Sequence, residues 1–220
     1  MKISWQEEEF ELLPEKAIFW SREKTLFLAD PHFGKAASFR KVGIPISEAS
    51  CENDLVNLSL LVRKTSAQTI VFLGDFLHAR TSRSELIKTM LFEWRCQFPG
   101  IELHLIRGNH DLKSGDPWAE LEIKCHNEPM RMCSWDCRHH PLNDSSIPYF
   151  AGHLHPGYSL HGKGRVSVRS ACFQVGEKRI ILPAFGSFTG LQNIKLELHD
   201  QVFMTDGINI LKVPIIHNVC

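Results

Sequence analysis

Five short segments of the chain contain residue types that bind metal ions or transfer protons. They are Asp30-Pro31-His32, Gly74-Asp75, Gly108-Asn109-His110-Asp111, Arg138-His139-His140-Pro141 and Gly152-His153-Leu154-His155. Four of them directly follow an apolar run, the position at which open α/β sheets place their ligand-binding residues. Alternate side chains of an extended chain point to the same side, so Asp30 and His32 can reach one cation. The joint occurrence of the five segments indicates one shared site.

The donor atoms of these segments favour a particular kind of metal centre. Carboxylate, imidazole and amide ligands without cysteine fit borderline-hard ions such as manganese, iron or zinc. Two such ions need a bridging carboxylate and lie about 3.5–4 Å apart in two-metal sites. Together they generate hydroxide and bind a phosphoryl oxygen. The segments therefore predict a centre that acts on a phosphate ester.

Alternating strands and helices are expected to position these segments. Strand-like apolar runs cover residues 10–13, 17–20, 25–29, 69–73 and 101–106. Ser47 and Ser84 are expected helix caps, because apolar residues recur after each at spacings of three and four. Beyond Asp111 the β-prone runs are short, at 130–133, 149–151, 166–173, 178–182 and 201–204. This order predicts a single domain over residues 1–220, of the α/β class, with a mainly β second half.

Composition constrains where the protein acts. The N-terminus carries Glu7, Glu8 and Glu9 and lacks the pattern of a signal peptide, and no apolar run reaches the 18 or so residues of a membrane span. The seven cysteines are an odd number in a chain of 220 residues, which fits a reducing compartment. We therefore expect a cytoplasmic protein that does not contact membranes.

The order of the five segments resembles that of the calcineurin-like metallophosphoesterase superfamily, from Asp30 to His155. Residues 30–40 and 182–190 further resemble the family of ligase-associated DNA damage response endonucleases, which extends the resemblance over most of the chain. The resemblance implies a four-layer α-β-β-α sandwich, in which two mixed sheets lie between helices. It also implies two divalent metal ions, with manganese expected first and iron or zinc as alternatives.

The superfamily pattern assigns roles to individual residues. One metal is expected on the residues that match Asp30, His32, Asp75 and His155. The other is expected on Asp75, Asn109, His139 and His153, so that Asp75 bridges the two ions. His139 is chosen by its position, although the neighbouring His140 could be the ligand instead.

The same resemblance implies a mechanism. His110 matches the catalytic histidine that stabilises the transferring phosphoryl group and protonates the leaving oxygen, with Asp111 as its expected orienting partner. The implied nucleophile is a hydroxide that bridges the two metals and attacks in line.

A polyanionic substrate needs a local basic patch here, because 25 basic and 25 acidic residues give a net charge of zero. Lys35, Arg40, Arg80 and Arg107 flank the ligand segments and could contact phosphates, or they form an ordinary solvated face. Phe33, Phe39 and Phe76 could stack on bases, or they belong to the core. The resemblance favours single-stranded or open DNA as the substrate in repair, with a ligase or helicase as an implied partner.

Three other interpretations are compatible with the same residues. The protein could hydrolyse a small phosphodiester or a nucleotide instead of DNA. It could be a binding scaffold that has lost its chemistry, although the catalytic histidine and its neighbours are present. A structural zinc site could also form from a group of cysteines and histidines in the second half, although their spacings match no common zinc motif. That group is Cys125, His126, Cys133, Cys137, His139 and His140.

Overall fold

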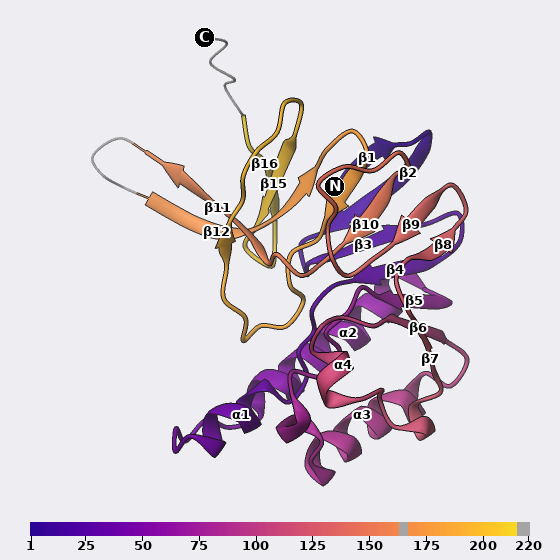
Figure 1. The fold of residues 1–220 in the computed structure, drawn as a ribbon, viewed down its shortest axis with the longest axis vertical. Coiled ribbons are helices and arrows are strands. Elements are labelled where there is room, and N and C mark those ends of the chain that lie inside the picture. Colours follow the sequence, from indigo (N-terminus) through magenta and orange to yellow (C-terminus); the bar gives the residue numbers. More distant parts are fainter. Residues whose placement is uncertain (163–166, 215–220) are drawn as a thin grey trace.

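The computed structural model describes residues 1–162 and 167–214, and its first mixed sheet is built by the first 126 residues (Figure 1). The strands lie in sequence order, antiparallel from β1 to β4 and parallel from β4 to β7. They are β1 (Lys2–Trp5), β2 (Glu8–Leu13), β3 (Ala17–Trp20), β4 (Thr25–Leu28), β5 (Thr69–Phe72), β6 (Glu102–Ile106) and β7 (Ile123–His126). The parallel half is the part that carries the first ligand segments.

The second sheet is built by the rest of the chain and is also mixed. Its main path runs in the order β14-β11-β12-β13-β10-β9-β8, and β15 and β16 extend from β12. The strands are β8 (Met130–Met132), β9 (Trp135–Cys137), β10 (Tyr149–Ala151), β11 (Pro156–His161), β12 (Ser167–Val175), β13 (Arg179–Ile181), β14 (Gln192–Asn193), β15 (Gln201–Thr205) and β16 (Ile210–Lys212). Strand β10 runs parallel to both β9 and β13, so their carboxyl ends lie at one edge.

Helices cover the outer face of the first sheet (Figure 1). They are α1 (Lys35–Lys41), α2 (Ala49–Thr65), α3 (Glu85–Gln97) and α4 (Asp111–Ser114), with 3-10 turns η1 (Arg80–Ser82) and η2 (Ala119–Leu121). The Ser84 hydroxyl accepts a 3.3 Å hydrogen bond from the Ile87 amide, which confirms this cap. The cap of α2 is Glu48 instead of Ser47. None of the helices in 1–162 and 167–214 has the length and apolar character of a membrane span.

Two hydrophobic clusters explain why β3, β4 and β5, in the middle of the first sheet, are almost wholly apolar. One cluster packs Leu26, Leu28 and other residues of the sheet against α2 and α3. The other lies between the two sheets and buries Phe27 from the opposite face of β4 against Phe150 of the second sheet, their rings stacked 4.8 Å apart. A strand buried on both faces has no polar side. This packing fixes one sheet against the other.

The two mixed sheets confirm the predicted α/β sandwich, but the expected fourth layer is not helical. Within the described residues every helix precedes β7, and loops cover the outer face of the second sheet. Leu142 and Leu154 pack there over Tyr149 and Ile181, and Ile194 packs near Cys172 in a separate cluster. The short apolar stretches in these loops supply the cover that a helix was expected to give.

The ligand segments meet because the carboxyl ends of parallel strands from both sheets face one another. Segments after β4, β5 and β6 come from the first sheet, and segments after β9 and β10 come from the second. A parallel bridge between Ala29 and Ala184 joins the two sheets at this edge. The Asp30 amide donates a 3.3 Å hydrogen bond to the Gly74 carbonyl, and the His32 amide donates one of 3.0 Å to the Asp75 carbonyl.

Candidate metal centre

One group of donor atoms lies at the end of β4 and is completed by a residue of the second sheet. The Nε2 atoms of His32 and His155 are 3.2 Å apart, and His155 Nε2 is 3.6 Å from Asp30 Oδ1. All three side chains offer atoms within 4.8 Å of one another, a spacing that one ion can span. The first expected ligand set is therefore brought together.

A second group of donor atoms lies beside the first. His139 Nε2 is 3.0 Å from Asn109 Oδ1, 3.1 Å from His153 Nδ1 and 3.4 Å from Asp75 Oδ1. Asn109 follows β6 of the first sheet, whereas His139 and His153 follow β9 and β10 of the second. These residues are the expected second ligand set.

Asp75 stands between the two groups and offers each a different oxygen. Its Oδ1 atom faces His139, and its Oδ2 atom is 3.8 Å from His32 Nε2. The Asp75 side chain is buried, which removes water as its alternative partner. This is the arrangement that a bridging carboxylate requires.

The burial of the donors tests whether the site fits a cation. Asp30 is fully buried, and its Oδ2 atom accepts a 2.8 Å hydrogen bond from the His153 amide. Its Oδ1 atom has no hydrogen-bond partner among the described residues. Burial followed by the neighbouring His155 lowers the pKa of His32, which keeps that imidazole neutral. An unpaired buried carboxylate oxygen is costly without a cation beside it, so these residues fit the metal ion that they are expected to hold.

The structure distinguishes His139 from His140. His139 is fully buried. Its Nδ1 atom lies 3.0 Å from the Leu73 carbonyl, and because a carbonyl can only accept a hydrogen bond, this nitrogen carries the proton and donates it. That bond leaves Nε2 free to bind a metal. The half-exposed His140 instead places Nδ1 2.6 Å from Glu128 Oε1. His140 groups with His139 and His153 within 4.8 Å, but only His139 also has printed contacts with Asp75 and Asn109, at 3.4 and 3.0 Å. These contacts support His139, the residue chosen by position, as the proposed ligand.

The backbone around the centre is unusual. Asp30, His32, Asp75, His153 and His155 all have positive φ angles, between 46° and 69°. Such angles are uncommon outside glycine, although Asp and His are among the residues that adopt them more often. Gly74 precedes Asp75 with φ of 88°, and a Cβ atom at Gly74 would collide with the His139 ring. Strained turns and a close glycine let the donors converge.

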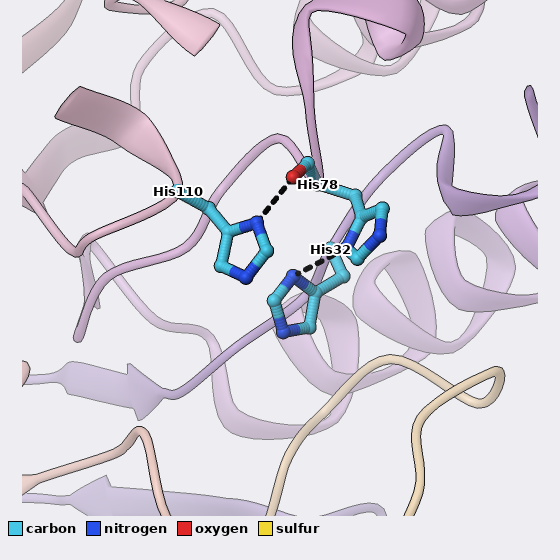
Figure 2. A group of neighbouring side chains, drawn as sticks. All are labelled: His32, His78 and His110. Atoms are coloured by element: carbon cyan, nitrogen blue, oxygen red, sulfur yellow. Dashed lines mark hydrogen bonds between the residues drawn. The ribbon is translucent and has the colours of Figure 1, made fainter. Parts of the chain in front are cut away.

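His110 lies at the edge of the centre and has a partner that the sequence did not predict. Its Nδ1–H donates a short hydrogen bond to the backbone carbonyl of His78 (Figure 2). Its Nε2 atom lies 3.8 Å from Asp75 Oδ2. The rings of His78 and His110 stack with centroids 4.8 Å apart. His78 Nδ1 is also 3.4 Å from His32 Nδ1. A histidine three residues after Asp75 was the only available signal of this contact.

Asp111 does not orient His110 as expected. Its carboxylate accepts backbone hydrogen bonds from Asp75 at 2.7 Å, Gly108 at 2.9 Å and Phe76 at 3.0 Å. Burial, together with the charge of Asp75, raises the pKa of Asp111 to about 7. The contacts assign to Asp111 the role of holding the ligand loops together.

The four cations expected to bind phosphate differ in whether other groups of the protein already pair with their charge. Lys35 lies near the centre, and burial followed by its charge lowers the pKa of His78 to about 4. Arg107 forms two 2.7 Å bonds with Asp116, and Arg80 donates 2.9 Å to the Lys113 carbonyl. Arg40 is ion-paired with Glu48. Of the four, Lys35 is therefore the cation best placed for substrate.

The structure also bears on the expected base stacking by phenylalanines and on the alternative zinc site. Phe33 and Phe76 are buried in the core with the helices, and their rings contact each other in a T shape, so they cannot stack on bases. Phe39 packs edge-on against Phe188. No group of donors that includes a cysteine comes close enough to bind a metal within 1–162 and 167–214, which speaks against the zinc site.

Two neighbouring donor groups with a shared carboxylate, on the edge of a two-sheet sandwich, form the kind of site that holds two metal ions in phosphatases, nucleases and aminopeptidases. Residues 23–182 match the family model described as calcineurin-like phosphoesterase, so the chain belongs to that family, whose members use divalent metal ions. The fold is similar to the crystal structure of Pseudomonas putida nuclease MPE, with a TM-score of 0.84 and 32% sequence identity. That alignment covers 97% of this chain and 99% of the nuclease. No curated protein matches the sequence.

Proposed function

We propose that the protein is an endonuclease that cuts single-stranded or otherwise open DNA during repair, using two manganese ions. The observation that carries the proposal is the pair of donor groups that share Asp75, with the Nε2 atom of His110 beside them at 3.8 Å from Asp75 Oδ2. The nuclease to which the chain is similar supports a nucleic acid as the substrate.

The proposed metal ligands follow the two donor groups. One ion is held by Asp30, His32, Asp75 and His155, and the other by Asp75, Asn109, His139 and His153. When bound, the ions supply an activated water as nucleophile and neutralise charge on the phosphoryl oxygens. Carboxylate and imidazole donors without cysteine suit manganese, with iron and zinc as alternatives.

Residues of the chain are proposed to donate a proton to the leaving group and to bind the substrate phosphate. The bond from His110 Nδ1–H to the His78 carbonyl fixes the ring, so that Nε2 is the atom that faces the centre. In the protonated state, Nε2 donates to the leaving oxygen of the phosphodiester. Lys35, whose charge reaches His78, attracts the phosphate. Asp111 positions the loops that carry Asp75 and Asn109.

A hydrolase of small phosphodiesters or nucleotides is the second candidate. The observation that favours it is the pairing of Arg40, Arg80 and Arg107 with acidic or carbonyl groups of the protein. A polyanion gains less from cations that are already neutralised. Strongly salt-dependent binding of oligonucleotides would favour DNA over a small diester.

Closed circular single-stranded DNA gives the decisive test. We expect manganese-loaded protein to convert circles to linear strands, because only internal cleavage can open a circle. The Asp75→Ala variant, purified in parallel, is expected to leave the circles intact and reveals any contaminating nuclease. Intact circles with the wild-type protein would contradict the endonuclease assignment and favour the small-diester hydrolase. Cytoplasmic location and a ligase or helicase partner stay predictions that rest on composition and resemblance alone.

A further inference from the structure

A cavity of about 680 Å³ lies next to the second donor group and contains no residue of the first. His140 and His153 line the end nearest the centre. The remaining walls come from residues 141–143, Leu154, Gln174 of β12, Arg179 and Ile181 of β13, residues 192–195 and Glu197. Its size is within the roughly 300–1,000 Å³ of ligand pockets in proteins. The cavity therefore continues the site onto the outer face of the second sheet.

The lining combines apolar surface with side-chain amides. Leu142, Leu154, Ile181 and Ile194 provide the apolar part. The amide groups come from the exposed residues Asn143, Gln192 and Asn193. Amide side chains both donate and accept hydrogen bonds and carry no charge. This is the chemistry that recognises a flat ring with polar edges.

The wall formed by residues 192–197 is held in place by buried hydrogen bonds. Gln174 is only 3% exposed. Its Nε2 atom donates a 2.6 Å hydrogen bond to Asp200 and a 3.1 Å hydrogen bond to the Lys195 carbonyl. Asp200 also accepts 2.8 Å from the Glu197 amide and 3.0 Å from Arg179. A cavity whose wall is fixed before binding loses less free energy when it orders a ligand.

The charges in the cavity argue against a phosphate as its occupant. Arg179 is paired with Glu197 and Asp200, so its charge is compensated. Lys195 forms no ion pair with any other described residue and is exposed, so it is available to a neighbouring phosphate. The interior accordingly suits an uncharged ring, and the single free cation suits the backbone to which that ring is attached.

We propose that this cavity binds the nucleobase of a nucleotide adjacent to the scissile phosphate, from an unpaired strand. The inference rests on the proposed nuclease function. It adds that the DNA strand inserts one of its bases into this cavity. A base in a duplex is stacked and paired, and extracting it costs free energy that an unpaired base does not require. Occupation of the cavity thus provides a physical reason for a preference for single-stranded DNA.

The test compares oligonucleotides that are complete with oligonucleotides that lack one base next to the cleavage site. With manganese-loaded wild-type protein, we expect the abasic position to lower kcat/KM by about tenfold or more, the usual scale for one bound base. In the Ile194→Trp variant a larger side chain fills the cavity, so the ratio of the two kcat/KM values is expected to approach one. Because both substrates are measured on one variant, a general loss of activity cancels.

Two further variants keep the test decisive. Asn143→Trp enters the cavity from the opposite, exposed loop and serves if Ile194→Trp does not fold. Leu198→Trp is the matched control, because Leu198 lies on the same segment, is 72% exposed and does not line the cavity. It is expected to keep the wild-type ratio. A wild-type ratio near one at every position, with DNA cleavage intact, would overturn the cavity assignment alone. Failure to cleave the complete strand would overturn the proposed function itself.

Discussion

His110 shows how much of the chemistry at this site depends on backbone atoms. Its ring is fixed by the carbonyl of His78, and the His78 ring stacks on it and approaches His32 (Figure 2). A carbonyl acceptor requires the proton on Nδ1, so the Nε2 atom faces the centre. The orientation of this residue therefore does not depend on a carboxylate partner.

Replacing His110 with alanine separates catalysis from folding and metal binding. We expect kcat to fall by roughly 10²–10⁴-fold, the usual contribution of a positioned acid. Manganese content and thermal stability should stay close to wild type, because His110 is not among the residues proposed to bind either metal ion. Turnover, metal analysis and calorimetry on the same preparation check this. A variant with wild-type turnover would refute the assigned role.

Asp111 is predicted to be a stability residue. Asp111→Ala removes the acceptor of three buried amides, and each unsatisfied amide costs about 1–3 kcal/mol. We expect the free energy of unfolding to fall by at least about 3 kcal/mol, measured by urea denaturation. Asp111→Asn, which keeps one acceptor oxygen, should lose less. Equal stability of wild type and Asp111→Ala would contradict the role.

At this scale the sequence was informative about side chains and uninformative about backbone partners. That Asp30, His32 and Asp75 lie at one site could be predicted, because metal-binding residue types are few and here they follow strands. The roles of His78 and Asp111 were not, because both depend on contacts with peptide groups that any residue carries. The choice of His139 over His140 stays a prediction, which the contacts of His139 with Asp75 and Asn109 support.

Among the elements, the turns after the strands determine the geometry of the centre. Gly108, between β6 and Asn109, packs so closely that a Cβ atom there would lie 2.8 Å from both the Asp75 nitrogen and His139 Cε1. The methyl group of an alanine at position 108 would therefore displace the side chains of Asp75 and His139. The turn, more than the strand, specifies the spacing of the ligands.

Gly108→Ala is expected to weaken manganese binding by roughly 10–100-fold, the scale of changes in the residues that support metal ligands. Titration followed by calorimetry or by electron paramagnetic resonance measures this. Gly100→Ala is the matched control, because nothing lies within 4 Å of its added Cβ. Similar losses in both variants would show that the close approach at Gly108 is irrelevant.

Helix α2 contacts the segment after β13 through Asp54, whose carboxylate oxygens accept 3.0 and 3.2 Å bonds from the Ser187 amide. Burial raises the pKa of Asp54 to about 6 from 3.8. The folded protein therefore holds this proton more tightly than the unfolded chain. The resulting contribution to stability is complete below about pH 4 and is lost as the pH rises through about 6.

Comparison of wild type with Asp54→Asn isolates this effect. The amide cannot ionise and keeps one acceptor for Ser187, so the stability of wild type relative to the variant should fall between pH 4 and pH 7. The change is expected to be at most about 3 kcal/mol, since one pKa unit corresponds to about 1.4 kcal/mol. Urea denaturation of both proteins across this range measures it. A difference that does not vary with pH would contradict the assignment.

The elements themselves were predictable where the apolar pattern was long. The predicted strands at 17–20, 69–73 and 101–106 match β3, β5 and β6 within a residue, because these strands are buried. Short elements such as α1 and β9 gave no periodic signal. The run at 166–173 corresponds to β12 except for Val166, which lies outside the described residues.

For the whole molecule, the site is divided between the two sheets and is therefore coupled to their packing. The core between the sheets holds them together without the metals, whereas the proposed ligands Asp75 and His139 join them at the edge. A ligand that binds only the folded state stabilises it, by about 2.7 kcal/mol at 100 times its Kd. Metals should act as such a ligand.

Removal of metal is thus expected to lower the melting temperature. For a chain of this size, 2.7 kcal/mol corresponds to roughly 5–10 °C. Scanning calorimetry with manganese and with a chelator measures the shift, and the Asp75→Ala variant should show little of it. An equal shift in both proteins would indicate stabilisation by metal bound elsewhere. The sequence predicted this two-sheet architecture only through resemblance, because short strands do not reveal which sheet they join.

The order of the sheets along the chain also divides the donors by chemistry. The first sheet supplies every proposed oxygen ligand, from Asp30, Asp75 and Asn109, and a single imidazole, from His32. The second sheet supplies only imidazoles, from His139, His153 and His155. Oxygen-rich sites suit magnesium and calcium, and added imidazole shifts selectivity toward transition metals. We therefore expect metal selectivity to depend on how tightly the two sheets pack, and mutations in the aromatic core between them to alter it.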